Sequence, residues 1–567
     1  MTISKKLALL LFGFFLSHLL TALGLTIFSH RAFRLEYPFE LMQFYSFSLL
    51  HFHLIPNKFH IFAVFYICMS LVPIIIYQAI LERSTTDKYG YAKFAPEKML
   101  KGMGLNFRNG IVFGLVRKGM WQKILNPFEA KKVIRSQEPL SVLLMAPPGT
   151  GKSAGVIIPT LLTLQNSVVV HDPKGELYDA THEARLKLGH QVMIFDIDEK
   201  DSIKFNPFAP NKLPSDPLEL KPYVVNIANI IFKSHKENHG NTSYFVNAAR
   251  NAFTTMATHL IYKEGYTSII KIRDKILENS SVSKTFEQLK EVPLNEFKIP
   301  DAKLRKALET DINSVLVAAS SPDQWAGVMG SLTEKLDYFS DPKIASIIDC
   351  EVSSFSADDL RSQKISIYLR VKDKDKAKLQ TLVSMIFESL GTELISKNPK
   401  KSDNQITFIL DEFVRLGRVD ILTELTSISR GYNFNQIFVI QDLEQISNTY
   451  SREYMSILES NCAYKIIMKQ NNFLTAEKIA KIIGFKTDTR TSTSKRDKAS
   501  PHHNEGKSIS KSEEGIYLVT PQDILNLDKN QCLIIVQGFA ATPILADIAW
   551  WFKDKNLWPK KVISMRN

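Results

Sequence analysis

Residues 141–153 read SVLLMAPPGTGKS, and the apolar run AGVIIPTLL follows directly at 154–162. An apolar, strand-like run that enters a glycine-containing loop and continues into a helix is the local context of a phosphate-binding P-loop. Gly149 and Gly151 permit tight turns in which successive backbone N–H groups point at phosphate oxygens. The start of the following helix adds the positive end of its dipole. The stretch therefore predicts a nucleotide site on an α/β fold, although a GKS triplet also occurs by chance in loops.

The P-loop assigns roles to two side chains. The amine of Lys152 is expected to reach the β and γ phosphates, and the hydroxyl of Ser153 to bind Mg²⁺. Ala146 stands where the strict motif has its first glycine, and alanine is small enough to replace it. The predicted cofactors are ATP and Mg²⁺. The residues expected to hold the nucleotide are Ala146, Pro147, Pro148, Gly149, Thr150, Gly151, Lys152 and Ser153.

A second motif supplies the acidic groups that such a site needs. The apolar run ITFILDE (406–412) ends in the adjacent carboxylates Asp411 and Glu412. One acidic group belongs in the Mg²⁺ shell, and a second orients or deprotonates the attacking water. Asp411 fits the first role and Glu412 the second. Taken alone, the pair also fits a strand end that faces solvent.

Three further places carry weaker signals. Gln441 ends the run IFVIQ and is a candidate for contact with the γ-phosphate or the water, although a terminal Gln is often only a cap. Arg430, in SISRGYN, is either an arginine finger that acts across a subunit interface or one more surface arginine. His171, Asp172 and Lys174 lie in HDPKGE, which also fits a turn held by an Asx-type bond.

Short apolar runs recur along the chain, and helical patterns separate most of them. Continuous runs are typical of strands buried on both faces of a largely parallel sheet, so we predict a doubly wound α/β core. Residues 212–360 instead predict an all-helical insertion, and the polar stretch 486–514 predicts a mobile loop. The predicted strands are 141–146, 167–172, 192–197, 365–369, 406–412, 436–442, 464–470 and 532–538.

The N-terminal region carries two uncharged stretches, at 7–28 and 61–81. Each is long enough to cross a bilayer as a helix. A cleaved signal peptide is the alternative for the first stretch, and a buried core helix kinked at Pro73 for the second. Basic residues are denser in 82–111 than in 29–58, which places both the N-terminus and the long remainder in the cytoplasm. The prediction is a membrane hairpin with a short external loop at 29–58.

Composition bounds the partners. The 567 residues carry a formal net charge of +13, which fits a phosphate-bearing partner, either nucleic acid or an anionic membrane surface. The four cysteines stand far apart and form no CxxC pair, which argues against a disulfide scaffold and a structural zinc cluster. They are Cys68, Cys350, Cys462 and Cys532.

Together these features resemble the coupling proteins of type IV secretion systems, the TraG/TraD-like conjugation ATPases. The similarity covers nearly the whole chain. Its most specific element is DPKGELYDAT, because P-loops and DE strands occur far more widely. The matching segments are the N-terminal hairpin, APPGTGKS with IPTLL (146–162), VVVHDPKGELYDAT (168–181), KFNPF (204–208), FILDEF (408–413) and SRGYNFNQIFVIQ (429–441).

The resemblance implies an anchor at 1–81, a RecA-like P-loop ATPase domain at 82–211 and 361–567, and an inserted all-α domain at 212–360. It implies a homohexamer at the bacterial inner membrane that passes DNA with its relaxase, effector proteins or both to the secretion channel. Gln441 would be a sensor, and Arg430 would act on the neighbouring subunit's nucleotide. The alternatives are an FtsK-type membrane-anchored DNA translocase, an assembly ATPase of the secretion apparatus, and a membrane scaffold that uses ATP only to assemble.

Overall fold

The computed structural model describes residues 87–117, 131–233, 241–278, 282–495, 507–553 and Trp558. Both predicted membrane spans, 7–28 and 61–81, lie outside these ranges. Within them, the structure contains no helix that combines the length and the apolar character needed to cross a membrane. The chain divides into two compact units, Met1–Tyr91 with Phe485–Ile516, and Ala92–Gly484 with Tyr517–Asn567.

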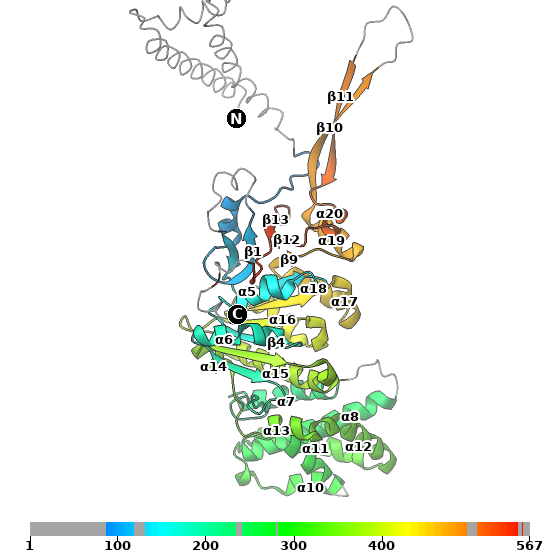
Figure 1. Ribbon diagram of the computed structural model, residues 1–567. Coiled ribbons are helices and arrows are strands. Elements are labelled where there is room, and N and C mark those ends of the chain that lie inside the picture. The colour runs from blue at the N-terminus through cyan, green and yellow to red at the C-terminus, as the bar shows by residue number, and fades with distance from the viewer. Residues whose placement is uncertain are drawn as a thin grey trace, which may run out of the picture. The chain divides into compact units, whose positions relative to one another are not determined.

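The larger unit is built on an 11-stranded sheet with the order β2-β1-β13-β12-β9-β3-β8-β7-β4-β6-β5 (Figure 1). All eight predicted strands are present in it, and seven of them form its parallel part. These seven strands are β9 (Tyr464–Ile467), β3 (Val142–Met145), β8 (Phe434–Ile440), β7 (Ile406–Leu410), β4 (Ser167–Asp172), β6 (Ile365–Arg370) and β5 (Gln191–Phe195).

The rest of the sheet is an antiparallel extension beyond β9, so the sheet is mixed. Only β12 of this extension was expected from the sequence. The others are short, and the run IVFGLV is interrupted by a register shift between Val112 and Gly114, so its apolar signal is weak. The four strands are β12 (Gln531–Val536), β13 (Ile544–Asp547), β1 (Ile111–Val116) and β2 (Val133–Ser136).

Side chains of each central strand alternate between two hydrophobic clusters, one on each face of the sheet. Leu143 and Met145 of β3 join one cluster, and Val142 and Leu144 join the other. Because both faces are covered, the strands are mostly apolar on both faces instead of alternating between apolar and polar residues. The helices of the larger unit outside the β5–β6 connection are α5 (Ile158–Leu161), α6 (Glu176–Lys187), α15 (Lys376–Ser396), α16 (Asp420–Ile428), α17 (Leu443–Thr449), α18 (Arg452–Asn461), α19 (Phe473–Ile483) and α20 (Pro521–Leu525).

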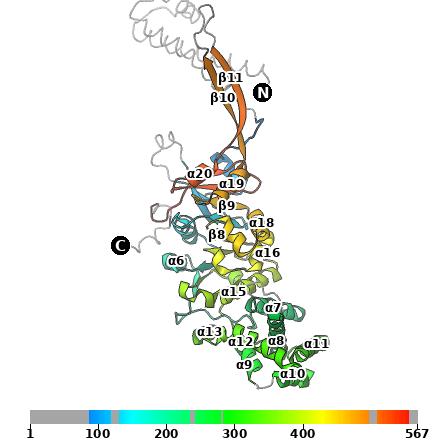
Figure 2. The ribbon, with the colours of Figure 1, turned by 90° about the vertical axis from the view of Figure 1, so that its right-hand side faces the viewer.

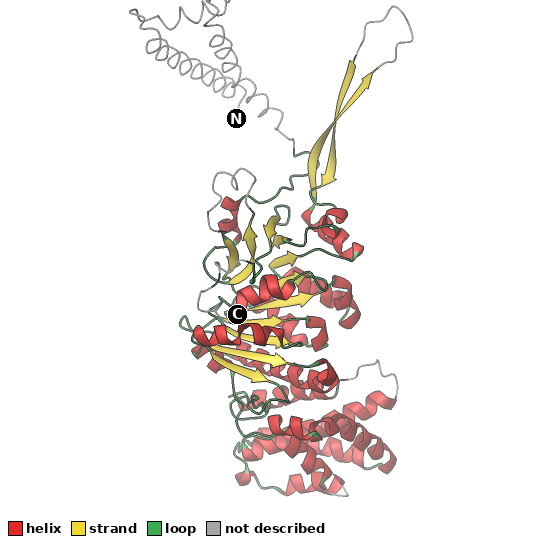
Figure 3. Ribbon diagram, viewed as in Figure 1, coloured by secondary structure: helices red, strands yellow, loops and turns green. Residues whose placement is uncertain are grey.

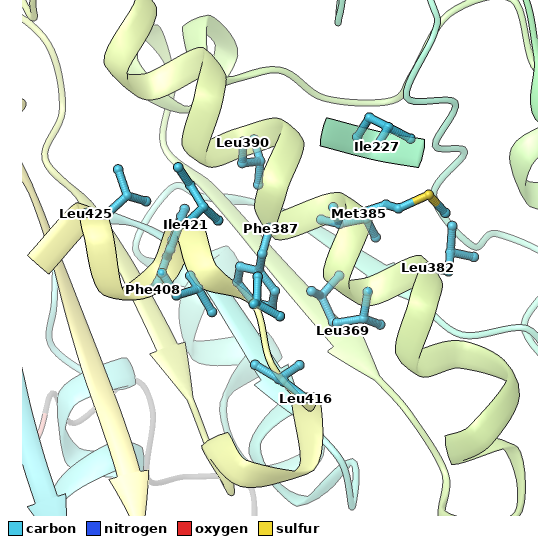
Figure 4. Close-up of a cluster of buried hydrophobic side chains, with 14 of the residues drawn as sticks. Ile227, Leu369, Leu382, Met385, Phe387, Leu390, Phe408, Leu416, Ile421 and Leu425 are labelled. Carbon is cyan, nitrogen blue, oxygen red and sulfur yellow. The ribbon is translucent and has the colours of Figure 1, made fainter. Parts of the chain in front are cut away.

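Helices α15 and α16 cover the first face near the predicted site. Phe387 of α15 lies 5.5 Å, centroid to centroid, from Phe408 of β7, and Ile421 and Leu425 of α16 join the same cluster (Figure 4). Residues of α5 and α6, including Leu161 and Leu177, belong to the cluster on the opposite face. This is the doubly wound arrangement that the spacing of the apolar runs predicts.

The connection from β5 to β6 is helical. Its described residues contain no strand, and most of its helices gather at one end of the larger unit (Figures 2 and 3). Several begin at a capping aspartate, such as Asp216, whose carboxylate accepts from Leu218 N at 2.9 Å. The helices are α7 (Pro217–Ile231), α8 (Asn241–Glu264), α9 (Ile269–Leu277), α10 (Val282–Glu291), α11 (Ala302–Ala319), α12 (Pro322–Leu336), α13 (Pro342–Ile348) and, directly before β6, α14 (Ala357–Ser362).

The prediction of a mobile loop over 486–514 is wrong for the described part of that stretch. Strands β10 (Phe485–Lys495) and β11 (Lys507–Tyr517) pair as a two-stranded sheet. Threonines recur at alternate positions of β10, and a β-branched residue favours a strand even where no apolar side chain marks it. The base of this ribbon bonds to the chain near Tyr91, with a bridge from Tyr91 to Lys486 and a bond from Thr487 N to Gly90 O of 3.0 Å.

Candidate nucleotide-binding site

The predicted motifs meet at one edge of the sheet, because parallel strands end on the same side. Strand β3 leads into the P-loop, β7 leads into Asp411, and β8 lies between them. Two strand spacings of about 4.8 Å separate β3 from β7, or about 10 Å in all. A lysine side chain after one strand and a carboxylate side chain after the other can together bridge that distance.

The backbone of the P-loop has the shape that its glycines allow. Gly149 and Gly151 have φ of 78° and 88°, in the left-handed region. Thr150 Oγ1 donates to Pro147 O at 2.7 Å, and Gly155 N donates to Gly151 O at 2.7 Å. Among the described residues, only Glu412 and Asn433 combine a side chain with a positive φ, so Ala146 needs no glycine. Its N–H donates to Ile440 O at 2.9 Å.

The segment after β13 packs against the P-loop, which the sequence analysis did not foresee. A Cβ atom on Gly151 would meet Trp550 Cη2 at 2.2 Å, and one on Gly155 would meet Ile548 Cγ2 at 2.2 Å. Trp551 N donates to Ala154 O at 3.2 Å. The two glycines are therefore required for packing as well as for the loop's conformation.

The two carboxylates after β7 face the P-loop lysine. Lys152 Nζ lies 3.6 Å from Asp411 Oδ1 and 3.6 Å from Glu412 Oε1. Burial raises the pKa of Asp411, with the Lys152 amine opposing the shift and the Glu412 carboxylate adding to it. Asp411 Oδ1 has no hydrogen-bond partner among the described residues. Glu412 itself adopts φ 54° and ψ 54°, a left-handed conformation that is strained for a glutamate.

The turn after β4 joins this site. His171 pairs with Leu410 in the β4–β7 register, so Asp172 and Asp411 follow neighbouring positions of adjacent strands. Burial raises the pKa of Asp172 to about 7, and repulsion from Asp411 contributes. His171 Nδ1 lies 2.8 Å from Asp411 O. Lys174 Nζ lies 3.6 Å from Glu412 Oε1.

Arg415 completes the surroundings of Glu412, because its Nε contacts Glu412 Oε2. The residue lies three positions after Glu412, in the short helical turn Phe413–Leu416. The sequence motifs predict neither the contact of Arg415 with Glu412 nor that of Lys174. Basic residues do lie close to each motif in the sequence. They do not reveal the strand order that brings β4 beside β7, and the Lys174 contact depends on that order.

The structure separates the two weaker candidates. Gln441 directly follows β8 at the same edge as the P-loop, where its Oε1 accepts from Gln445 Nε2 at 3.1 Å. Arg430 precedes β8 and lies at the opposite edge, 4.0 Å from Glu138 Oε2, with its side chain 76% exposed. Seven strand residues span about 20 Å, so Arg430 does not reach the nucleotide site of its own chain.

Comparison with known proteins identifies relatives. VirD4 of Rhizobium radiobacter is 27% identical over 490 residues, which are 85% of this chain and 66% of that protein. TraG of Escherichia coli is 25% identical over 431 residues, which are 70% of this chain and 65% of that protein. The matches thus span about two thirds of the length of these relatives.

Solved structures show the same fold at low sequence identity. The bacterial conjugative coupling protein TrwBΔN70, in its unbound form, has a TM-score of 0.51 and 14% identity, over 81% of this chain and 95% of its own. The plasmid coupling protein TrwB in complex with ADP and Mg²⁺ has a TM-score of 0.52 and 14% identity, over 81% and 97%.

A family model matches far more of the chain than any single motif does. The model describes the type IV secretory system conjugative DNA transfer proteins and covers residues 94–565. This range includes the P-loop, the acidic pair, the helical connection and the antiparallel strands. The resemblance to type IV coupling proteins is confirmed, and the chain belongs to the type IV secretory system conjugative DNA transfer family.

Proposed function

We propose that this protein is the ATPase that couples substrates to a type IV secretion channel, and that it hydrolyses ATP with Mg²⁺ at the carboxyl edge of its sheet. The observation that carries the proposal is the position of Lys152, 3.6 Å from both Asp411 and Glu412. A lysine with two carboxylates beyond a glycine-containing loop is the set of groups that phosphoryl transfer requires. TrwB, whose fold is similar, has been solved with ADP and Mg²⁺.

The residues present fit the nucleotide and the metal ion. The P-loop backbone from Gly149 to Ser153 would cradle the phosphates, and Lys152 would pair with the β and γ oxygens. Ser153 and Asp411 would bind Mg²⁺, for which Asp411 Oδ1 is available because it makes no hydrogen bond among the described residues. The metal ion would neutralise charge on the phosphates. Glu412 would orient the attacking water and accept its proton, with Gln441 nearby at the end of β8.

The assembly is proposed on the same basis. Arg430 is exposed at the opposite edge of the sheet from its own nucleotide site, which supports a role as a finger in the adjacent subunit of a homohexameric ring. The strand order, in which β8 lies between the P-loop strand and the acidic strand, supports a RecA-like ATPase domain. Residues 7–28 and 61–81 would anchor that domain at the bacterial inner membrane, with the ATPase in the cytoplasm.

The proposed cargo is DNA with its relaxase, effector protein, or both, received by the helical segment 212–360. The family description, conjugative DNA transfer, and the relative TraG, a conjugal transfer protein, support DNA as a cargo. The formal charge of +13 favours a polyanionic cargo. Contacts to DNA would be mainly electrostatic, so affinity should fall steeply as salt is raised.

The test is ATP hydrolysis by the purified full-length protein in detergent, with and without DNA. We expect turnover that needs Mg²⁺, rises with DNA and is lost in Lys152→Ala. The matched control is Lys200→Ala, which changes an exposed lysine on the loop after β5. The proposal fails if Lys152→Ala hydrolyses ATP at the wild-type rate, or if the same variant supports normal transfer of cargo.

A further inference from the structure

Three cations surround one carboxylate of the site. Glu412 Oε1 lies 3.6 Å from Lys152 Nζ and 3.6 Å from Lys174 Nζ, and its Oε2 contacts Arg415 Nε. The Glu412 side chain is only 9% exposed, whereas that of Lys174 is 49% exposed. An ion pair between two exposed groups contributes little to the free energy of unfolding. The Glu412 carboxylate is nearly buried, however, so a contact with it can determine its orientation in the site.

The three cations are not equivalent once ATP is bound. Lys152 belongs to the P-loop, and its amine is then needed by the phosphates. Arg415 lies on the same turn as Glu412, and its N–H donates to Glu412 O at 2.8 Å, so it moves with the residue that it contacts. Of the two remaining cations, Lys174 is the one that reaches Glu412 from another strand connection, the turn after β4. It can therefore fix the carboxylate relative to the sheet.

The turn that carries Lys174 is itself held firmly. Gly175 N donates to Asp172 O at 3.2 Å, and Tyr178 N donates to Asp172 Oδ2 at 2.8 Å. Gly175 has φ 75°, and a Cβ there would meet Arg370 Cδ at 2.8 Å. A well-defined turn gives the Lys174 backbone one position, although its side chain is half exposed.

The backbone of Glu412 makes this restraint necessary. Its left-handed conformation is strained for a residue with a side chain, so the surroundings must hold it. The contact of Lys174 opposes rotation of the carboxylate away from the site. Strain of this kind persists only where neighbouring groups determine the geometry.

We propose that Lys174 is a positioning residue for ATP hydrolysis, which holds the Glu412 carboxylate in place when Lys152 is engaged by the phosphates. The proposal rests on the proposed ATPase function. Lys174 touches neither the phosphates nor the water in this scheme. Its removal should therefore slow turnover without weakening nucleotide binding.

The experiment compares Lys174→Gln, Lys174→Arg and the control Lys200→Gln in the full-length protein. We expect kcat of Lys174→Gln to fall about tenfold, a part of what a general base contributes, with KM and the Kd for a fluorescent ATP analogue within twofold of wild type. Lys174→Arg should recover most of the rate, since arginine keeps the charge and reach. Lys200→Gln should match the wild type.

Each other outcome overturns the inference. An unchanged kcat in Lys174→Gln removes any role in turnover. A raised Kd with normal kcat assigns Lys174 to nucleotide binding, and a lowered Tm with parallel loss of kcat and binding assigns it to folding. Failure of the proposed function has a different signature, because Lys152→Ala and Glu412→Gln would then also keep the wild-type rate.

Discussion

The indole ring of Trp550 lies directly against Gly151, so that a Cβ atom at residue 151 would stand 2.2 Å from Trp550 Cη2. The contact joins the P-loop to the segment that follows β13, and Trp550 Nε1 donates to Asn530 Oδ1 at 3.2 Å. The aromatic side chain of Trp550 thus packs against the loop that is expected to bind the phosphates. Gly151 also has a φ of 88°, which few residues other than glycine adopt.

Gly151→Ala should destabilise the protein by about 1–3 kcal/mol, because the new methyl group meets the indole and the backbone is strained. The measurement is thermal unfolding followed by circular dichroism, alongside ATP binding. In the Trp550→Ala background, Gly151→Ala should cost less than in the wild type, because the steric part of the loss is gone and only the backbone strain remains. Equal stability of the single variant and the wild type would contradict this account.

Glu412→Gln should separate binding from turnover. The amide keeps the size of the side chain but cannot accept a proton, so we expect kcat to fall on the order of 100-fold while ATP affinity is retained. Rapid-quench measurement of phosphate release and equilibrium binding of a fluorescent ATP analogue would give the two quantities. A parallel loss of affinity would instead indicate that Glu412 holds the nucleotide.

Arg430→Ala should leave nucleotide binding and Tm unchanged, because the side chain is 76% exposed and distant from its own site. If it acts on the neighbouring subunit, hydrolysis by the assembled protein should fall about a thousandfold. Mixing Arg430→Ala with Lys152→Ala subunits gives interfaces that contain both intact groups, so part of the activity should return. No recovery on mixing, under conditions where subunits exchange, would contradict action in trans.

A pH effect should arise from Glu388 on α15. Burial raises the pKa of Glu388 to about 7 from an ordinary value of 4.5, and repulsion from Glu424 and Asp420 on α16 adds to the shift. Between these values the folded state holds a proton that the unfolded state has lost. The free energy of unfolding therefore falls as pH rises through this range, and the loss is complete above about pH 7.

Glu388→Gln removes that contribution, since the amide carries no charge at any pH. We expect the Tm difference between the variant and the wild type to grow in favour of the variant from pH 5 to pH 8. Thermal scans at four pH values would measure it, with Glu424→Gln as a comparison that removes only one source of repulsion. A difference independent of pH would show that Glu388 titrates normally.

The central strands were predictable because burial on both faces makes them mostly apolar, as in SVLLMA and ITFIL. The antiparallel strands were not, since β13 and β2 are four residues long and β1 carries a bulge. The ribbon β10–β11 escaped prediction for another reason. Its described residues are mostly Ser, Thr and charged, so no hydrophobic pattern distinguishes it from a loop.

The candidate site likewise has a part that the sequence predicts and a part that depends on the packing of the whole sheet. Lys152, Asp411 and Glu412 lie in motifs whose chemistry is local, so their positions in the sequence sufficed to predict that they meet. The contact of Lys174 with Glu412 depends on β4 lying beside β7, which is set by the packing of the whole sheet. Arg430 lies at the edge of the sheet opposite the nucleotide site because it precedes β8. The residues around Arg430 do not predict the direction of that strand.

The bonds between Gly90, Tyr91 and the base of β10 have a practical consequence for any shortened form of this protein. In the smaller unit, the described residues near Tyr91 bond to the base of the ribbon β10–β11, although the two segments are distant in sequence. A two-stranded ribbon alone is only marginally stable in water. A truncation that removes the apolar stretches should begin before residue 87, because one that begins after residue 91 deletes the residues that bridge and bond to Lys486 and Thr487 at the base of β10.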